Sequence, residues 1–443
     1  MRILACGDAL FSSGNLANRL HNSLVDEFAH ADASFANAEF VCPKITTPPM
    51  PRRFSTAVSV SALDELMSLG INLVSFANNH TGDFGGQGVV DTIEAAEERG
   101  LMTGGIGRSL AAARSARFLD TPKGRIGLVA ASSTRAAEAT ASEPGKDIAP
   151  RAGLNPLRWG RAYVLPEEQF RQLQQIDESL GTAAARSEVM RVEVAPQTGD
   201  AAFNFGSHFE GSLRIEKGAS AHVRYFVDER DSQAILANVR DAANRSDIVI
   251  VSIHSHEGRD ENWYSPRPAS FLEDFARKAI DAGASAFFGH GPHMLRGIEI
   301  YKGRPIFYSL GSLLMEFEAG EQVMTPEMYA AYGFSSTSLP SDLHMSRVRN
   351  ASGELIGFYG DPRFSQGCIG ICDFEEREIK VRLLPLDLDL NRERTVERGL
   401  PVIADRKLGQ QICNNIAAMS EAYGTKLHYD DDGLITVTAG EAA

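Results

Sequence analysis

Hydrophobic and polar positions follow two different periods along this chain, and the two periods alternate. Short apolar runs such as RILACGD, INLVSFA and DIVIVSI are typical of buried strands. Between them, apolar residues recur at helical spacing, which predicts helices over 15–31, 59–70, 88–100, 167–194, 231–246 and 270–283. Apolar strands that alternate with helices predict an α/β core buried on both faces.

The second half of the chain adds antiparallel features to this pattern. A hairpin is expected over 295–311, turning at Lys302 and Gly303, and another over 367–388, turning in its acidic stretch. These hairpins imply a mixed sheet or a second sheet. We expect one domain over 1–390, with insertions near 134–225 and 317–366, the second of them irregular, and a helix and a strand in an extension over 391–443. Within the first insertion, residues 134–160 lack periodicity and are predicted to form a loop or lid.

Most polar residues of chemical interest follow a predicted core strand. In α/β sheets, ligands bind outside the carboxyl ends of the strands. Five such ends carry carboxylate, carboxamide or imidazole groups: Asp8; Asn37 and Glu39; Asn79, His80 and Asp83; His254, His256 and Glu257; and His290 and His293.

The number of these groups favours a functional site over a structural network. One histidine after a strand is more often structural, but a network of this size would bury many groups whose desolvation is costly. The remaining histidines are interpreted as surface or structural residues: His21, His30, His208, His222, His344 and His428.

The mixture of ligand types indicates a divalent ion with open coordination positions. Carboxylate, carboxamide and imidazole together suit Zn, Mn, Fe or Ca. A histidine beside an aspartate can instead act as an acid or base near neutral pH. The glycines of GDFGGQG allow a tight turn or a close ligand, but the P-loop lysine is absent and no GxSxG motif occurs.

Composition limits which binding partners and which cellular compartment are expected. The formal net charge of −14 over 443 residues argues against a nucleic-acid-binding surface. The five cysteines are an odd number without CxxC spacing, which favours free thiols in a reduced, cytoplasmic setting. No signal-peptide pattern and no run of about 18 apolar residues occurs, so no transmembrane segment is expected.

In order along the chain, CGD, ANAE, ANNHTGDFGGQG, VSIHSHEG and GHGPHMLRGIEIYKGRPIFYSLGS resemble the CapA family, named for poly-γ-glutamate capsule assembly. The resemblance implies a calcineurin-like metallophosphoesterase fold, with two mixed sheets flanked by helices in four layers (α/β/β/α). It also implies a metal site at the strand ends. RAGLNPLRW looks like a segment found in soluble relatives.

The resemblance and the strand-end pattern together give three sets of candidate residues. The metal-ligand candidates are Asp8, Glu39, Asn79, His254 and His290; the acid/base candidates are His80, Asp83, Asp8, His293 and His256; and the substrate-contact candidates are Asn37, Arg158 and Glu257.

Three departures from the family pattern change the expected metal site. HSHEG stands where the family often has His-Trp-Gly-x-Glu, GHGPH replaces GHHPH, and the DxH opening of ordinary metallophosphoesterases is absent. These departures favour one ion or a looser site over a two-metal phosphatase centre. The membrane anchor common in capsule-assembly members is not visible either.

Three functions remain open at this point. The first is metal-dependent hydrolysis of a phosphoester or of a peptide or γ-glutamyl bond, with His80 as acid or orienting group. The second is inversion of a peptide Cα by His/Asp pairs, as in the lasso-peptide epimerases that resemble CapA proteins. The third is non-catalytic binding or assembly of poly-glutamate.

Overall fold

Two large β-sheets form the centre of the molecule. The computed structural model describes all residues except 194–200, 210, 317–323, 377 and 441–443. One sheet has ten strands: β1 (Arg2–Leu10), β2 (Ala33–Ala38), β3 (Leu73–Ser75), β4 (Met102–Gly104), β17 (Ser312–Met315), β18 (Gln366–Phe374), β19 (Ile379–Asp387), β20 (Val402–Ile403), β21 (Thr425–Tyr429) and β22 (Ile435–Ala439). The other has six: β6 (Arg117–Thr121), β7 (Gly124–Ser132), β13 (Ile248–His254), β14 (Ala286–His290), β15 (Ile298–Tyr301) and β16 (Arg304–Phe307).

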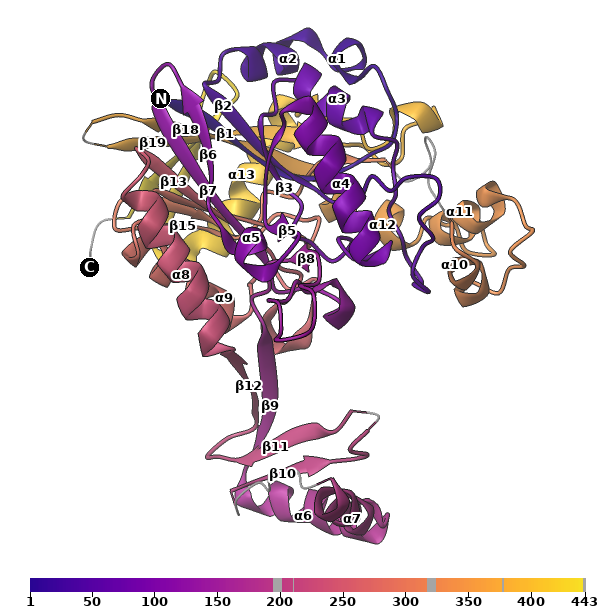
Figure 1. Cartoon of the computed structure of the whole chain (residues 1–443). Coiled ribbons are helices and arrows are strands. Elements are labelled where there is room, and N and C mark those ends of the chain that lie inside the picture. The colour runs from indigo at the N-terminus through magenta and orange to yellow at the C-terminus, as the bar shows by residue number, and fades with distance from the viewer. Residues whose placement is uncertain (194–200, 210, 317–323, 377, 441–443) are drawn as a thin grey trace.

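Side-chain alternation along the central strands explains why the two sheets stack. In β1, Ile3 and Ala5 face the core between the sheets, whereas Leu4 and Cys6 face the outer helices. The outer helices on that side are α2 (Asn22–Ala29), α3 (Ser61–Ser68) and α4 (Gly85–Arg99). Strand β13 divides its residues in the same way and packs outward against α8 (Glu229–Ala243) and α9 (Ser270–Asp281). This four-layer arrangement, visible in Figure 1, confirms the predicted fold class.

The direction of the central strands places their chemistry at one edge. Strands β1, β2, β3 and β4 pair in parallel in one sheet, and β7, β13, β14 and β16 pair in parallel in the other. The hairpin β15–β16 turns at Lys302 and Gly303 as predicted, since both have positive φ angles of 50° and 73°. The second predicted hairpin is β18–β19, and the tail strands β21 and β22 extend the large sheet through β19.

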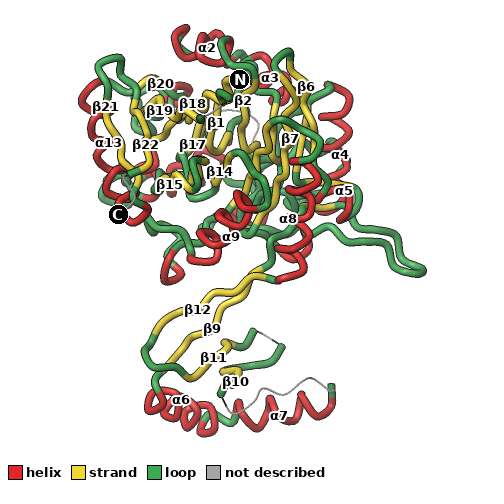
Figure 2. Tube along the Cα trace, turned by 90° about the vertical axis from the view of Figure 1, so that its left-hand side faces the viewer, coloured by secondary structure: helices red, strands yellow, loops and turns green. Residues whose placement is uncertain are grey.

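A smaller unit projects from this body, as Figures 1 and 2 show. It contains β9 (Trp159–Leu165), β10 (Ala202–Phe205), β11 (Leu213–Lys217) and β12 (His222–Val227), covered by α6 (Glu167–Ser179) and α7 (Thr182–Val192). One helix was predicted over 167–194, but Gly181 adopts a left-handed conformation (φ 76°) that ends α6 and starts α7. Residue 194 lies outside the described residues.

Two further predictions about local structure were wrong. The helix predicted over 15–31 is divided into α1 (Leu16–Arg19) and α2, because Leu20 is extended and the ring of His21 caps α2. The insertion predicted as irregular over 317–366 contains α10 (Pro326–Ala331), α11 (Pro340–Val348) and α12 (Gly357–Gly360), while its first seven residues, 317–323, lie outside the described residues. Other short elements include α5 (Leu110–Arg114), β5 (Ile106–Gly107) and β8 (Gly153–Leu154), and the tail contains the helix α13 (Arg406–Ser420).

A glycine contact sets the position of β1 at the site. The pairing of β1 shifts register around Gly7 and Asp8, where β1 changes from its β18 neighbour to β17. A Cβ at Gly7 would lie 1.7 Å from the backbone oxygen of Gly311, so only glycine fits.

We therefore expect Gly7→Ala to lower the free energy of unfolding by about 3 kcal/mol or more, because the clash is with backbone that cannot rotate away. Urea unfolding followed by circular dichroism measures this. The matched control is Gly14→Ala, whose Cβ would have its nearest contact at 3.4 Å and should change stability by less than about 0.5 kcal/mol. Equal effects of the two substitutions would contradict the packing argument.

Candidate metal centre and its cavity

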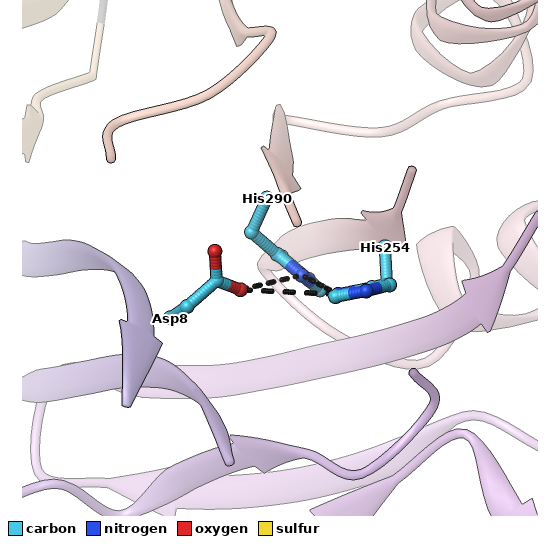
Figure 3. Close-up of side chains that lie close together, drawn as sticks. All are labelled: Asp8, His254 and His290. Carbon is cyan, nitrogen blue, oxygen red and sulfur yellow. Dashed lines mark hydrogen bonds and ion pairs between the residues drawn. The ribbon is translucent and has the colours of Figure 1, made fainter. Parts of the chain in front are cut away.

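Strand ends from both sheets meet at a group of three buried residues. Asp8 lies in β1, and His254 and His290 end the neighbouring strands β13 and β14 (Figure 3). Oδ1 of Asp8 lies 3.8 Å from Nδ1 of His254 and 3.6 Å from Nδ1 of His290. These three side chains are buried and offer ligand atoms close enough together to hold a metal ion.

A second group of three adjoins the first. Glu39 follows β2, and its Oε1 lies 3.6 Å from Nε2 of His293 and 3.9 Å from Nε2 of His256. The same oxygen lies 3.8 Å from Nε2 of His254 and 3.9 Å from Nε2 of His80. Four imidazoles from three separate strand ends therefore surround one carboxylate oxygen.

The hydrogen-bonding state of these atoms fits a cation. Both carboxylate oxygens of Glu39, Nε2 of His254 and of His256, and Oδ1 of Asn79 are buried with no hydrogen-bond partner among the described residues. Leaving so many buried polar atoms unsatisfied is costly. Ligands of one divalent ion, at bonds of about 2.0–2.2 Å, stand about 3–4 Å apart, which is the spacing found here. The residues present therefore fit a divalent metal ion.

Burial sets the protonation states that metal ligands require. It lowers the pKa of His290 to about 4 and the pKa values of His254 and His256 well below their usual range, so these rings are neutral near pH 7. Burial, with the charge of Asp8, raises the pKa of Glu39 well above its usual value. Burial alone would raise the pKa of Asp8, but a hydrogen bond to His293 and the nearby imidazoles bring it below its usual value.

Polar groups behind the ligands hold them in place. Asn37, which was predicted to contact substrate, is fully buried; it donates to Oδ1 of Asp8 (2.8 Å) and lies 3.3 Å from Nδ1 of His254. The hydroxyl of Ser252 lies 2.8 Å from Nε2 of His290, which leaves Nδ1 of that ring facing Asp8. Gly291 occupies the position where the family commonly has a histidine; its amide donates to Oδ2 of Asp8 (2.9 Å).

A separate dyad lies at the edge of the cluster. Nδ1 of His80 lies 2.7 Å from Oδ2 of Asp83, and Oδ1 of Asp83 accepts from Arg52 at 2.6 Å. The amide of Thr56 also donates to Asp83, at 2.7 Å. Asp83 is thus an acceptor from three sides, and it directs Nε2 of His80 toward Glu39. Arg52 was not identified as a site residue from the sequence. It belongs to the segment PRRFST (51–56), which precedes the NNHTGD motif that contains His80 and Asp83.

A buried arginine organises the loop that carries His256. Arg296 has no exposed surface, and its guanidinium donates to the carbonyl oxygens of Ser255, His256, Glu257, Trp263 and Ser265 at 3.0–3.4 Å. These hydrogen bonds connect residues 255–257 at the start of the loop with residues 263–265 at its end.

The cluster opens into a cavity of about 1170 Å³. Asn79, His80, His256, Glu257 and His293 line it, so the structure brings these predicted residues together around one space. The carboxylate of Glu257 accepts from the hydroxyls of Ser133, Thr134 and Ser255.

Two sequence interpretations look different in the structure. Arg158 lies outside the cluster, and its guanidinium pairs with the buried Asp231 at 2.6 Å. His344, interpreted as surface or structural, lines the cavity instead. Sequence reasoning also missed the aromatic residues of this lining.

The fold and the cluster together define an α/β/β/α protein of the calcineurin-like metallophosphoesterase architecture, with a ligand set able to hold metal where the strands end. The family model described as "Bacterial capsule synthesis protein PGA_cap" matches residues 2–316, and the chain belongs to this family. The match contains every residue of the metal-ligand groups. The helices α10–α12, which help to line the cavity, follow it.

The chain is also similar to several individual bacterial proteins. Two Sinorhizobium fredii proteins, "Uncharacterized protein y4sH" and "Uncharacterized protein y4uA", are each 31% identical over 98% of this chain and 92% of their own length. A "Probable polyglutamine synthesis accessory protein" of Mycobacterium tuberculosis is 26% identical over 74% of this chain and 64% of its own. "PGA biosynthesis protein CapA" of Bacillus subtilis is 37% identical over 19% of this chain and 21% of its own.

Across the part of the chain that the structure describes, no helix is both long enough and apolar enough to cross a membrane. All five cysteines are buried and form no disulfide.

The lowered pKa values predict acid sensitivity of the chelator-treated protein. Between about pH 6.5 and pH 4, the unfolded chain protonates His290 while the folded chain does not, so acid favours unfolding. We expect the free energy of unfolding to fall by about 1.4 kcal/mol per pH unit for each such histidine.

Urea midpoints at pH 7, 6, 5 and 4.5 test this expectation. His290→Asn should flatten the slope by about one proton. Identical slopes for wild type and His290→Asn would contradict the assignment.

Proposed function

We propose that this protein is a metal-dependent hydrolase of a phosphoester or of a peptide or γ-glutamyl bond. The observation that carries the proposal is the ring of four imidazole Nε2 atoms within 3.6–3.9 Å of Oε1 of Glu39, beside a large cavity. The names of the relatives, which refer to PGA and polyglutamine synthesis, support a substrate with peptide or γ-glutamyl bonds.

Two groups of residues hold the metal in this proposal. Asp8, His254 and His290 form one, and Glu39, His256 and His293 the other, with Asn79 offering a further oxygen. A bound divalent ion supplies Lewis-acid polarisation of a carbonyl or phosphoryl oxygen and a lowered pKa for a neighbouring water. The neutral state of the buried rings leaves their nitrogen lone pairs available as ligands.

His80 moves the proton in this proposal. Its Nδ1–H is donated to Asp83, which leaves the lone pair of Nε2 directed toward the cluster. From there Nε2 accepts a proton from the attacking water and returns it to the leaving group. Arg52 keeps Asp83 in place by its bond to Oδ1, so the ring keeps one orientation.

The test is turnover of p-nitrophenyl phosphate, γ-glutamyl-p-nitroanilide and peptide p-nitroanilides with and without divalent metal. We expect chelation to abolish turnover and added metal to restore it. His80→Gln should lower kcat by about 100-fold or more, and Asp83→Asn should also lower it because the ring loses its orientation.

The matched control is His428→Gln, which changes an exposed histidine in β21. It should retain full activity. Metal-dependent turnover that persists unchanged in His80→Gln would remove His80 from the reaction, and the absence of turnover on every substrate class would remove the hydrolase.

A second candidate, epimerisation of a peptide Cα, is favoured by one observation. Two His/Asp pairs face the same space: His80 with Asp83, and His293 with Asp8, whose Nδ1 and Oδ2 lie 3.4 Å apart. Both imidazoles line the cavity, and both direct Nε2 toward Glu39. Inversion of a carbon requires one such group to remove a proton and another to return it.

Solvent isotope incorporation separates the two reactions. A peptide incubated with the protein in D₂O should show cleavage and no deuterium at Cα if the hydrolase is correct. Deuterium at one Cα without cleavage, measured by mass spectrometry, establishes the epimerase instead. His293→Gln should then abolish incorporation.

A further inference from the structure

Exposed aromatic side chains gather in the cavity. Of the six exposed Phe, Trp and Tyr residues that the structure describes, four line it: Phe54, Trp263, Tyr264 and Tyr332, with 36–46% of their surface exposed. Exposed apolar side chains are common when scattered singly, but a group of them in one concave space marks a binding surface.

The aromatic lining continues to the metal-ligand cluster. The ring of Trp263 lies 4.8 Å from that of His256. On the other side, Phe358 lies 5.9 Å from His293 and 4.6 Å from Phe364, and Phe364 in turn lies 5.6 Å from Tyr264. An apolar group bound on these rings is therefore next to the reacting groups.

A further wall is aromatic and cationic. Phe54 and Tyr332 meet edge to face at 6.1 Å, and the guanidinium of Arg347 lies 5.1 Å from the first ring and 5.7 Å from the second. Three segments of the chain build this wall, namely the loop before Thr56, the end of α10, and α11.

Arg135 is a guanidinium of the cavity lining without a carboxylate of its own among the described residues, and unlike the exposed Arg53 it is partly buried. Arg135 lines the cavity, forms no ion pair with any described residue, and has a buried Nε without a hydrogen-bond partner. By contrast, Arg52 and Arg363 in the same lining are paired with Asp83 and Asp361. An arginine in this state suits a carboxylate from a ligand.

We infer that the substrate is a peptide that carries a large apolar or aromatic side chain next to a carboxylate, and not a homopolymer of glutamate or a small phosphoester. The aromatic lining binds the side chain, and Arg135 binds the carboxylate. This inference rests on the proposed function for its site, and it narrows the substrate class. A volume of about 1170 Å³ accommodates more than one residue of such a peptide.

Tryptophan fluorescence gives a direct binding assay, because the chain has two tryptophans, Trp159 and Trp263, and both line the cavity. The probes are N-acetyl-Phe-Glu, N-acetyl-Gln-Glu of equal charge, the uncharged N-acetyl-Phe-Gln-amide, and tri-γ-glutamate. We expect N-acetyl-Phe-Glu to bind about tenfold more tightly than each of the others.

Three variants test the two contacts separately. Phe54→Ala should remove most of the preference for the phenylalanyl probe, and Tyr332→Ala should act in the same way. Arg135→Gln should weaken N-acetyl-Phe-Glu and N-acetyl-Gln-Glu equally and leave the amide unchanged. The matched control is Phe209→Ala, which removes a ring that is 72% exposed but outside the cavity.

Equal or tighter binding of N-acetyl-Gln-Glu or tri-γ-glutamate overturns the inference, as does the absence of binding by every probe at millimolar concentration. Binding does not require turnover, so the two proposals fail separately. A retained preference without metal-dependent hydrolysis removes only the hydrolase, and hydrolysis without a preference removes only the substrate class.

Discussion

The carboxylate of Glu39 is the group on which the rest of the site depends. Its oxygens are buried with no hydrogen-bond partner among the described residues, and four imidazoles face one of them. A buried carboxylate in such surroundings is stable only as the protonated acid or beside a positive ion. Burial holds the rings of His254 and His256 neutral, so these two rings do not supply that charge.

The fold surrounds the carboxylate of Glu39 with these rings because it brings the strand ends of two sheets together. Asp8 and Glu39 come from one sheet, and His254 and His290 come from the other. Their approach depends on close backbone contact, most clearly at Gly7, where a side chain would overlap Gly311. The position of the ligands is thus fixed by the packing of the layers more than by any single loop.

The sequence predicted much of this arrangement because strand ends are a local signal. The alternation of apolar strands and helices indicated the α/β core, and the polar residues that followed each strand indicated the cluster. The break at Gly181 was missed because the helical period continues across it, and φ is not visible in a period. Asn37 was assigned to substrate contact, but in the structure it donates a hydrogen bond to Asp8, and this pairing of residues from two different strands is not visible in the sequence.

The cavity lining was beyond sequence reasoning for a different reason. Phe54, Trp263 and Tyr332 are far apart along the chain, and an isolated aromatic residue carries no sign of whether it will be buried or exposed. Arg296 was likewise unassigned, since its partners are backbone carbonyls and leave no trace in the residue types around it.

The helices α10–α12 come after the part of the chain that matches the family model, whereas the metal-ligand groups lie entirely within it. One wall of the cavity is therefore encoded in the stretch of the gene that follows the candidate metal ligands, whereas Phe54, Arg135 and Trp263 of the lining lie within the matched stretch. Substitutions in the later stretch can reshape one wall of the cavity without changing a candidate metal ligand. Members of the family can in this way diverge in what they accept while keeping the same inherited centre.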